Sequence, residues 1–267
     1  MFIPATIDIT DVKRVVPAIS NEQRDNISGG KKWYYKRMLD KVTDKNGIIN
    51  GSELRDNIFP IEKDECFDVF ISYSHNDEET AYALYKYLKD KGLHVFLDSI
   101  VWYSADKLQY EIDKQYSKTN RFDPFFDYDK VQLSASHVHA MLSMAILEVI
   151  NRSELCLFLK SNKSLTLEEG IKNNTLSPWI YEELSYFKKV KTVTPPRLKQ
   201  YQTRYFCSTG NRIGMIVEQR ELKVHYNVDI RGLVQLCVCD LLTKSSGSEF
   251  LDDIYLKHGI LEYSLND

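Results

Sequence analysis

"FDVFISYSHNDEE", residues 67–79, is an apolar run that stops in a polar cluster and then continues as the start of a helix. The apolar part has the length and composition of a buried strand. Residues 77–92 follow with apolar side chains at helical spacing and end at Gly92, and residues 93–97 form a second apolar run. Strand, helix and strand within about thirty residues predict a right-handed βαβ unit with parallel strands.

The same alternation continues along the chain. Ser177 and Pro178 give one later helix a strong start signal, because serine caps a helix N-terminus and proline suits its first position. The elements that we expect after the first unit are a helix over residues 137–153, a strand over 154–161, a helix over 177–191, and a further strand and helix over 223–230 and 231–244.

This order predicts an α/β fold, a flavodoxin-like doubly wound parallel sheet. We expect residues 67–72, 93–97 and 154–159 to lie parallel in one sheet. Residues 1–62, which are polar and rich in turn signals, predict an N-terminal accessory segment. The main domain then covers residues 63–267, with a long insertion after the second strand at about residues 99–139 and a C-terminal extension.

Composition narrows the class of partner. The 267 residues carry 35 basic and 38 acidic side chains, a net charge of −3, so nothing calls for a nucleic acid as partner. The N-terminus has no charged start followed by a long apolar core, and no window approaches ~18 uninterrupted apolar residues. We therefore expect a cytoplasmic protein without a membrane partner.

Five cysteines are present, an odd number, and the sequence predicts no metal site. Cys237 and Cys239 are two residues apart, which is not the C-x-x-C spacing of zinc and redox motifs, and no histidine lies nearby in the sequence. Core packing is the favoured interpretation of this pair, with metal or redox chemistry as the alternative.

Polar side chains gather where the first two predicted strands end. Ser72, Tyr73, Ser74 and His75 follow the first strand, and Asp98 follows the second. In open α/β sheets ligands bind beyond the carboxyl ends of the strands, so these junctions predict one crevice. Backbone amides at the following helix start are suited to phosphate, although Tyr73 equally fits a core position.

Four stretches together resemble the Toll/interleukin-1 receptor (TIR) domain. They are "FDVFISYSHNDEE", "LKDKGLHVFLD", "SELCLFLKS" and "SPWIYEEL", which are similar in order and spacing to the family's first-strand box, second strand and W-x-x-x-E-L helix motif. Residues 65–108 and 140–190 resemble the family best, and the later strand and helix fit more loosely. The long segment after the second strand resembles a bacterial TIR subfamily.

The resemblance implies one of two functions. TIR domains are either scaffolds that assemble with one another or enzymes that cleave the nicotinamide–ribose bond of NAD⁺, and the enzymes carry a glutamate in the helix motif. Here that residue is Glu183, with Trp179 one turn earlier on the same helix face. The resemblance implies an NAD⁺ glycohydrolase or ADP-ribosyl cyclase-like enzyme of bacterial antiphage defence; the alternative is a non-catalytic interaction module.

The chemistry is consistent with one carboxylate. Nicotinamide leaves NAD⁺ as a neutral molecule, so no general acid is needed, and a carboxylate stabilises the positive charge that develops on the ribose. NAD⁺ is then a substrate and no cofactor is expected, in keeping with the absence of a G-x-G-x-x-G fingerprint. From the residues alone, Glu183 would be taken as a solvated helix carboxylate.

Other site residues have weaker support from the sequence. Asp98 is a candidate ligand of the ribose or the nicotinamide amide, or else a turn cap. Trp102 and Tyr103 either border the nicotinamide or pack the loop. His137 and His139 are pocket candidates or polar surface. The full substrate-binding set that we predict is Ser72, Tyr73, Ser74, His75, Asp98, Trp102, Tyr103, His137, His139 and Trp179.

The family also implies partners other than NAD⁺. TIR domains self-associate, and the aromatic side chains of residues 99–118 suit an interface. A downstream effector that senses the product is a further expected partner. The sequence leaves the acceptor of the ADP-ribosyl group open among water, the substrate's own adenine or ribose, and another small molecule.

Overall fold

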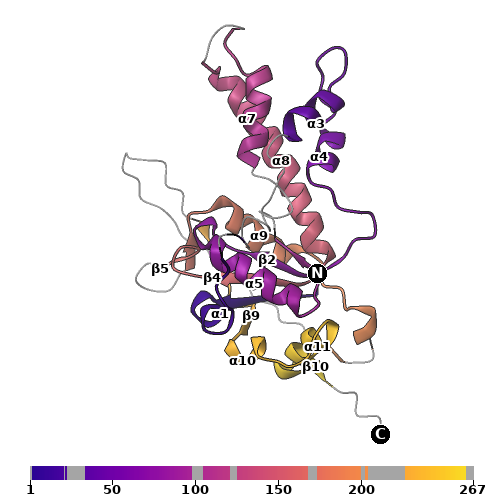
Figure 1. The fold of residues 1–267 in the computed structure, drawn as a ribbon, viewed down its shortest axis with the longest axis vertical. Coiled ribbons are helices and arrows are strands. Elements are labelled where there is room, and N and C mark those ends of the chain that lie inside the picture. Colours follow the sequence, from indigo (N-terminus) through magenta and orange to yellow (C-terminus); the bar gives the residue numbers. More distant parts are fainter. Residues whose placement is uncertain are drawn as a thin grey trace. The chain divides into compact units, whose positions relative to one another are not determined.

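The structure is a computed structural model and describes residues 2–20, 22, 34–97, 105–120, 125–167, 173–199, 202–203 and 226–262. The chain divides into two compact units. The first consists of residues 1–20, 66–96 and 150–267, and the second of residues 21–65 and 97–149. Figure 1 shows the elements of both units.

A five-stranded sheet forms the centre of the first unit. Its strand order is β3-β2-β4-β1-β9, and every neighbouring pair is parallel. Helices flank this sheet, which confirms the predicted flavodoxin-like α/β class and the parallel arrangement of the three predicted strands. The strands are β1 (Ile3–Asp8), β2 (Phe67–Ser72), β3 (Val95–Phe96), β4 (Ser153–Lys160) and β9 (Val234–Leu236).

The first strand corrects the domain boundary that the sequence suggested. β1 lies between β4 and β9, with Ile7 opposite Leu159 of β4, so the first 20 residues belong to the unit of the sheet. Residues 21–65 belong to the other unit, and the expected accessory segment 1–62 is therefore divided. This strand is difficult to predict from the sequence because Pro4 has no backbone N–H to donate, and proline is therefore rare in central strands.

Five α-helices of the first unit are described. Ser177 caps α9 as predicted, since its Oγ accepts a hydrogen bond of 3.3 Å from the Ile180 amide. Gly92 follows α5 with φ +84°, the left-handed conformation of a helix-terminating glycine. The helices are α1 (Ile9–Val15), α5 (Glu78–Asp90), α9 (Pro178–Lys189), α10 (Val238–Leu241) and α11 (Ser248–Lys257), with 3₁₀ turns η1 (His75–Asp77) and η2 (Pro196–Leu198).

The later part of the chain departs from the predicted alternation. Of the predicted strand 223–230, the structure describes residues 226–230, and these contain β8 (Tyr226–Asn227), which pairs antiparallel with β6 (Asn173–Thr175). Residues 231–244, expected to be one helix, contain the edge strand β9 followed by the short α10. β9 pairs with β1 in the main sheet, so its strand conformation could not be predicted without a prediction of β1. Two more short pairings involve β5 (Thr166–Leu167) with β6, and β7 (Gln202–Thr203) with β10 (Leu261–Glu262).

A charged cluster ties the C-terminal helix to the start of β4. Arg197 donates two hydrogen bonds of 2.6 Å to the Glu154 carboxylate and others to Asp252 of α11. The Tyr255 hydroxyl, on the same helix, donates to Glu154 at 3.0 Å. Bidentate arginine–carboxylate pairs are among the strongest hydrogen-bonded contacts, so the C-terminal extension is part of this unit's structure.

The second unit is helical. It contains α3 (Tyr34–Val42), α4 (Gly51–Ile58), α7 (Ala105–Tyr116) and most of α8 (Tyr128–Arg152). The buried carboxylate of Asp113 on α7 accepts hydrogen bonds of 2.5 Å from Ser117 and from Ser134 of α8. The predicted insertion at about residues 99–139 therefore holds α7 and the first half of α8.

Helix α8 is long and apolar enough to cross a membrane when judged by length and composition. Its mean hydropathy over the relevant window is 1.4, and 39% of that window is buried inside the structure. The core helix of a soluble protein passes the same test, so one such helix is weak evidence for a membrane span.

The position of β1 gives a direct test of the corrected boundary. The Ile7 side chain is fully buried, so Ile7→Ala should lower the free energy of unfolding by about 2–4 kcal/mol, through lost burial and the cavity left behind. Urea unfolding measures this change. Ile48→Ala is the control, because that side chain is 65% exposed and should shift stability by less than about 0.5 kcal/mol. Equal stability of the two variants would contradict the placement of β1.

Candidate functional site

The candidate site lies at the carboxyl end of β2, where this strand meets helix α9. Successive residues of a strand point to opposite faces, so Phe70 and Ser72 share one face of the sheet. The Phe70 ring contacts the Phe187 ring of α9, with centroids 6.1 Å apart and planes at 87°. Ser72, one step further along the same face, donates a hydrogen bond of 2.5 Å to Oε2 of Glu183.

Helical spacing places Glu183 at this contact. The buried residues of α9 are Ile180, Glu183, Leu184 and Phe187, which follow the i, i+3, i+4, i+7 pattern of one helix face. Phe187 and Glu183 are one turn apart, just as Phe70 and Ser72 are one pleat apart. An apolar pair and a polar pair therefore follow one another along the interface between β2 and α9.

Burial of Glu183 corrects one expectation from the sequence. The residues alone favour a solvated helix carboxylate, whereas the structure leaves 5% of Glu183 exposed. The Ser72 hydroxyl, 1% exposed, supplies a hydrogen bond for the buried carboxylate. Burial is the main cause that raises the pKa of the Cys156 thiol on β4, and Glu183 contributes to the same shift.

The adjacent glutamate has a different environment. Glu182 is half-buried, and its Oε1 accepts a hydrogen bond of 2.5 Å from the Tyr186 hydroxyl on the same helix. Adjacent residues of an α-helix are about 100° apart around its axis, so the Glu182 and Glu183 side chains leave α9 in different directions. Only Glu183 belongs to the buried face of α9.

The loop after β2 is fixed by contacts that the sequence analysis missed. Asp77 is buried, accepts a hydrogen bond from the Ser161 hydroxyl and lies 3.8 Å from the Lys163 ammonium. Lys163 also donates to the Asn76 carbonyl at 2.8 Å. Ser161 follows β4 directly, and its Oγ accepts from the Lys163 and Ser164 amides at 3.0 Å. The sequence "SNKS" at 161–164 carried a serine-turn signal for this loop.

The predicted site residues fall into three groups. Ser72 and Glu183 are in direct contact, and the buried Tyr73 lies edge-to-face with the exposed His75, 6.1 Å between ring centroids. Ser74 is buried, and Trp179 is half-buried on α9. His137 and His139 are exposed on α8 in the second unit. Asp98, Trp102 and Tyr103 lie outside the described residues.

Comparison with known families gives a match that includes Ser72 of the candidate site but not Glu183. Residues 69–132 match the family model of the TIR domain. No curated protein and no solved structure matches the chain. The TIR match covers β2, α5, β3, α7 and the first residues of α8, and it ends before α9. It supports a TIR domain protein without distinguishing a signalling module from an NAD⁺-cleaving enzyme.

A hollow of about 320 Å³ lies within the second unit, outside the predicted set of site residues. Arg55, Asp56 and Glu148 are among its lining residues. Arg55 pairs with Asp56 at 2.6 Å, so its guanidinium charge is compensated locally. The hollow therefore offers less support for a functional site than the contact between β2 and α9.

The Ser72–Glu183 contact can be tested without measuring activity. In a double-mutant cycle, Ser72→Ala and Glu183→Ala should show an interaction free energy of about 0.5–3 kcal/mol in urea unfolding, because each change removes the buried hydrogen bond that the two side chains share. The matched cycle of Ser72→Ala with Glu182→Ala should give a value near zero, since Glu182 bonds to Tyr186. Additive effects in the first cycle would contradict the contact.

Proposed function

We propose that the TIR region of this chain cleaves the nicotinamide–ribose bond of NAD⁺, with Glu183 as the catalytic carboxylate. The observation that carries the proposal is the buried Glu183 carboxylate, oriented by Ser72 at the carboxyl end of β2. The TIR match to residues 69–132 supports it from the family side. Trp179 and Glu183 on α9 also form the W-x-x-x-E pattern, whose glutamate is the one that the resemblance to enzymatic TIR domains implies as catalytic.

The setting of Glu183 suits the charge that develops in this reaction. As the bond to nicotinamide breaks, positive charge builds on the ribose while nicotinamide departs neutral. A carboxylate attracts this charge more strongly in a buried site than in water, because the effective dielectric constant is lower. Ser72 holds one carboxylate oxygen by its hydrogen bond, so the group needs little reorganisation as the charge forms.

The surrounding loop contributes a fixed frame and a positive charge. Ser161, Asp77 and Lys163 join the loop after β4 to the loop after β2. The Lys163 side chain is 59% exposed, which leaves its ammonium accessible to the diphosphate of a dinucleotide. We assign Lys163 a binding role and Glu183 the catalytic one.

The acceptor of the ADP-ribosyl group decides the product. Water gives linear ADP-ribose, attack by the substrate's own adenine or ribose gives a cyclic product, and a separate small molecule gives a conjugate. The proposed role in bacterial antiphage signalling, with an effector that senses the product, needs one of these products to accumulate. Mass spectrometry of the products distinguishes the three.

Substitution of the glutamate tests the proposal. Glu183→Gln keeps the side-chain volume and a hydrogen-bond acceptor for Ser72 but removes the charge, so nicotinamide release from NAD⁺ should fall by about 10²-fold or more. Glu182→Gln is the matched control and should keep most of the activity, because this residue lies on another helix face. Nicotinamide is quantified by chromatography, and urea unfolding checks that both variants are folded. Equal activity of Glu183→Gln and the parent would refute the assignment.

Self-association follows from the family and is supported by exposed aromatic side chains in the second unit. TIR domains commonly self-associate, and aromatic residues are enriched in interfaces. The candidates Trp102 and Tyr103 lie outside the described residues. Within the described residues of this unit, the most exposed aromatic side chains are Tyr110 (52%), Tyr116 (36%), Phe125 (71%), Phe126 (37%) and Tyr128 (75%).

If activity requires assembly, nicotinamide release per molecule should rise with protein concentration over a hundredfold range. Tyr110→Ser should move this rise to higher concentration, and Ile48→Ser, an exposed change elsewhere in the same unit, should not. A constant specific activity across the range would exclude assembly-dependent catalysis. Concentration-dependent association without nicotinamide release at any concentration would favour the alternative, a non-catalytic interaction module.

A further inference from the structure

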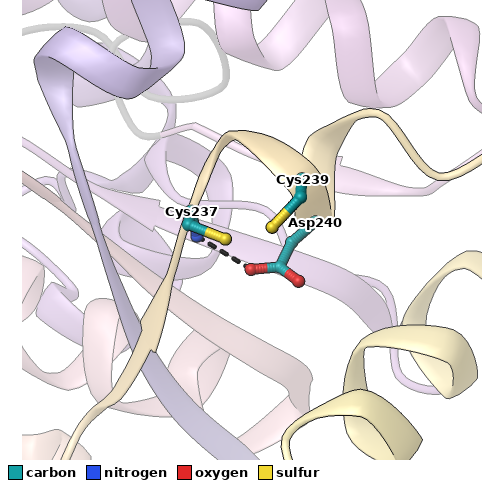
Figure 2. Close-up of side chains that lie close together, drawn as sticks. All are labelled: Cys237, Cys239 and Asp240. Atoms are coloured by element: carbon teal, nitrogen blue, oxygen red, sulfur yellow. Dashed lines mark hydrogen bonds between the residues drawn. The ribbon is translucent and has the colours of Figure 1, made fainter.

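A second group of reactive side chains lies away from Glu183, at the junction of β9 and α10. The sulfur atoms of Cys237 and Cys239 and a carboxylate oxygen of Asp240 all lie within 4.8 Å of one another, and Figure 2 shows both thiols and the carboxylate close together. The Cys237 amide donates a hydrogen bond of 2.8 Å to Asp240, drawn as the dashed line in Figure 2. The Asp240 side chain is fully buried.

Two side chains from the end of α11 complete this cysteine cluster. The Lys257 ammonium lies 2.9 Å from the Cys239 sulfur and 2.6 Å from the Asp240 carboxylate. His258 Nε2 lies 3.1 Å from the other oxygen of that carboxylate. The cation that faces both the thiol and the carboxylate is therefore a lysine of the chain itself.

The two thiols have unequal roles. Hydrogen bonds from the Cys237 thiol and then from Lys257 lower the pKa of Cys239. The same contact with Cys239, together with burial, raises the pKa of Cys237. Cys239 is exposed and Cys237 is half-buried. An exposed thiolate beside a lysine is the setting of a reactive cysteine, and a neighbouring thiol is positioned to react with its oxidised form.

We propose that Cys237 and Cys239 form a dithiol redox site in which Cys239 reacts with hydroperoxides and Cys237 resolves the product. The Cys239 thiolate attacks a peroxide oxygen, the O–O bond breaks, and the released hydroxide or alkoxide takes a proton from solvent, which leaves a sulfenic acid on Cys239. The Cys237 thiol then attacks that sulfur and releases water, and a disulfide forms. Together the two steps oxidise two thiols to one disulfide and reduce one peroxide, which yields two molecules of water from hydrogen peroxide or one alcohol and one water from an organic hydroperoxide.

The local backbone permits this bond. Cys237 is the extended N-cap of α10 and Val238 its first residue, so the two cysteines are separated by one helical residue. This spacing brings their Cα atoms within the range that a disulfide spans. The site is independent of the proposed NAD⁺ chemistry.

The first experiment oxidises the full-length reduced protein with less than one equivalent of hydrogen peroxide and maps the thiols by mass spectrometry. The expected product is an intramolecular Cys237–Cys239 disulfide, with Cys66 still reduced. Cys66 is the internal control, because it is exposed but has no cysteine within ten residues in the sequence. Oxidation of Cys66 at the same rate, or absence of the Cys237–Cys239 disulfide, would overturn the proposal.

The second experiment separates the two roles. In Cys237→Ser, a sulfenic acid on Cys239 should persist and be trapped by dimedone. Lys257→Met should slow alkylation of Cys239 by iodoacetamide at neutral pH by about tenfold, while Lys257→Arg should largely preserve the rate. Lys86→Met, which removes a lysine paired with Asp90 elsewhere, should have no effect. Trapping at a cysteine other than Cys239 would contradict the assignment.

A third measurement tests the metal alternative. Titration of the reduced protein with Co²⁺ should give no thiolate-to-metal absorption, because the Lys257 ammonium lies between the thiol and the carboxylate contacts that a metal would use. An intense absorption band that disappears in Cys239→Ser would show that the cluster binds metal and that the redox assignment is wrong.

Discussion

Pairing of β4 with strands on both of its sides is the constraint on which the first unit depends. β2 and β1 are far apart in sequence from β4, yet residues 155–158 of β4 have partners in both of them. Six of its eight residues, in positions 153 and 155–159, are buried. A strand buried on both faces has its register fixed by packing as well as by hydrogen bonds, because a shift of one residue would turn every side chain to the other face. The position of Ser72 at the carboxyl end of β2, opposite Phe158 of β4, follows from this register.

Contacts at the two ends of β4 connect this strand to the loop beside Ser72 and to the helix beside the cysteine cluster. At its start, Glu154 binds Arg197, which holds Asp252 of α11, and α11 ends in the Lys257 and His258 that face the cysteine cluster. Just after its end, Ser161 binds Asp77 and so fixes the loop that follows Ser72. β4 therefore positions Ser72 through the neighbouring strand β2. It positions the side chains that face the cysteine cluster through the contacts of Glu154, Arg197 and Asp252.

Local signals decided how much of this could be predicted from the sequence. β2 and β4 were predictable because each is a continuous apolar run, and α5 and α9 because apolar residues recur at helical spacing beside a terminating glycine, Gly92, or an N-cap, Ser177. β1 was not, since Pro4 and Asp8 weaken its pattern and only pairing with β4 makes it a strand. The cysteine cluster was also not predicted as a reactive site, because Lys257 and His258 lie 17 residues or more from Cys239 and Asp240 along the chain.

The meeting of Ser72 and Glu183 shows why some long-range contacts can nevertheless be expected. The two residues are 111 positions apart, but the strand period places Ser72 on the face of Phe70, and the helix period places Glu183 on the face of Phe187. Once the two phenylalanine rings pack, the next pair along the interface is determined. Glu182 has the same charge and nearly the same position in the sequence, yet it lies about 100° around the helix and bonds to Tyr186. Chemical identity alone therefore does not select the catalytic candidate; its phase in the helix relative to the buried aromatic contact does.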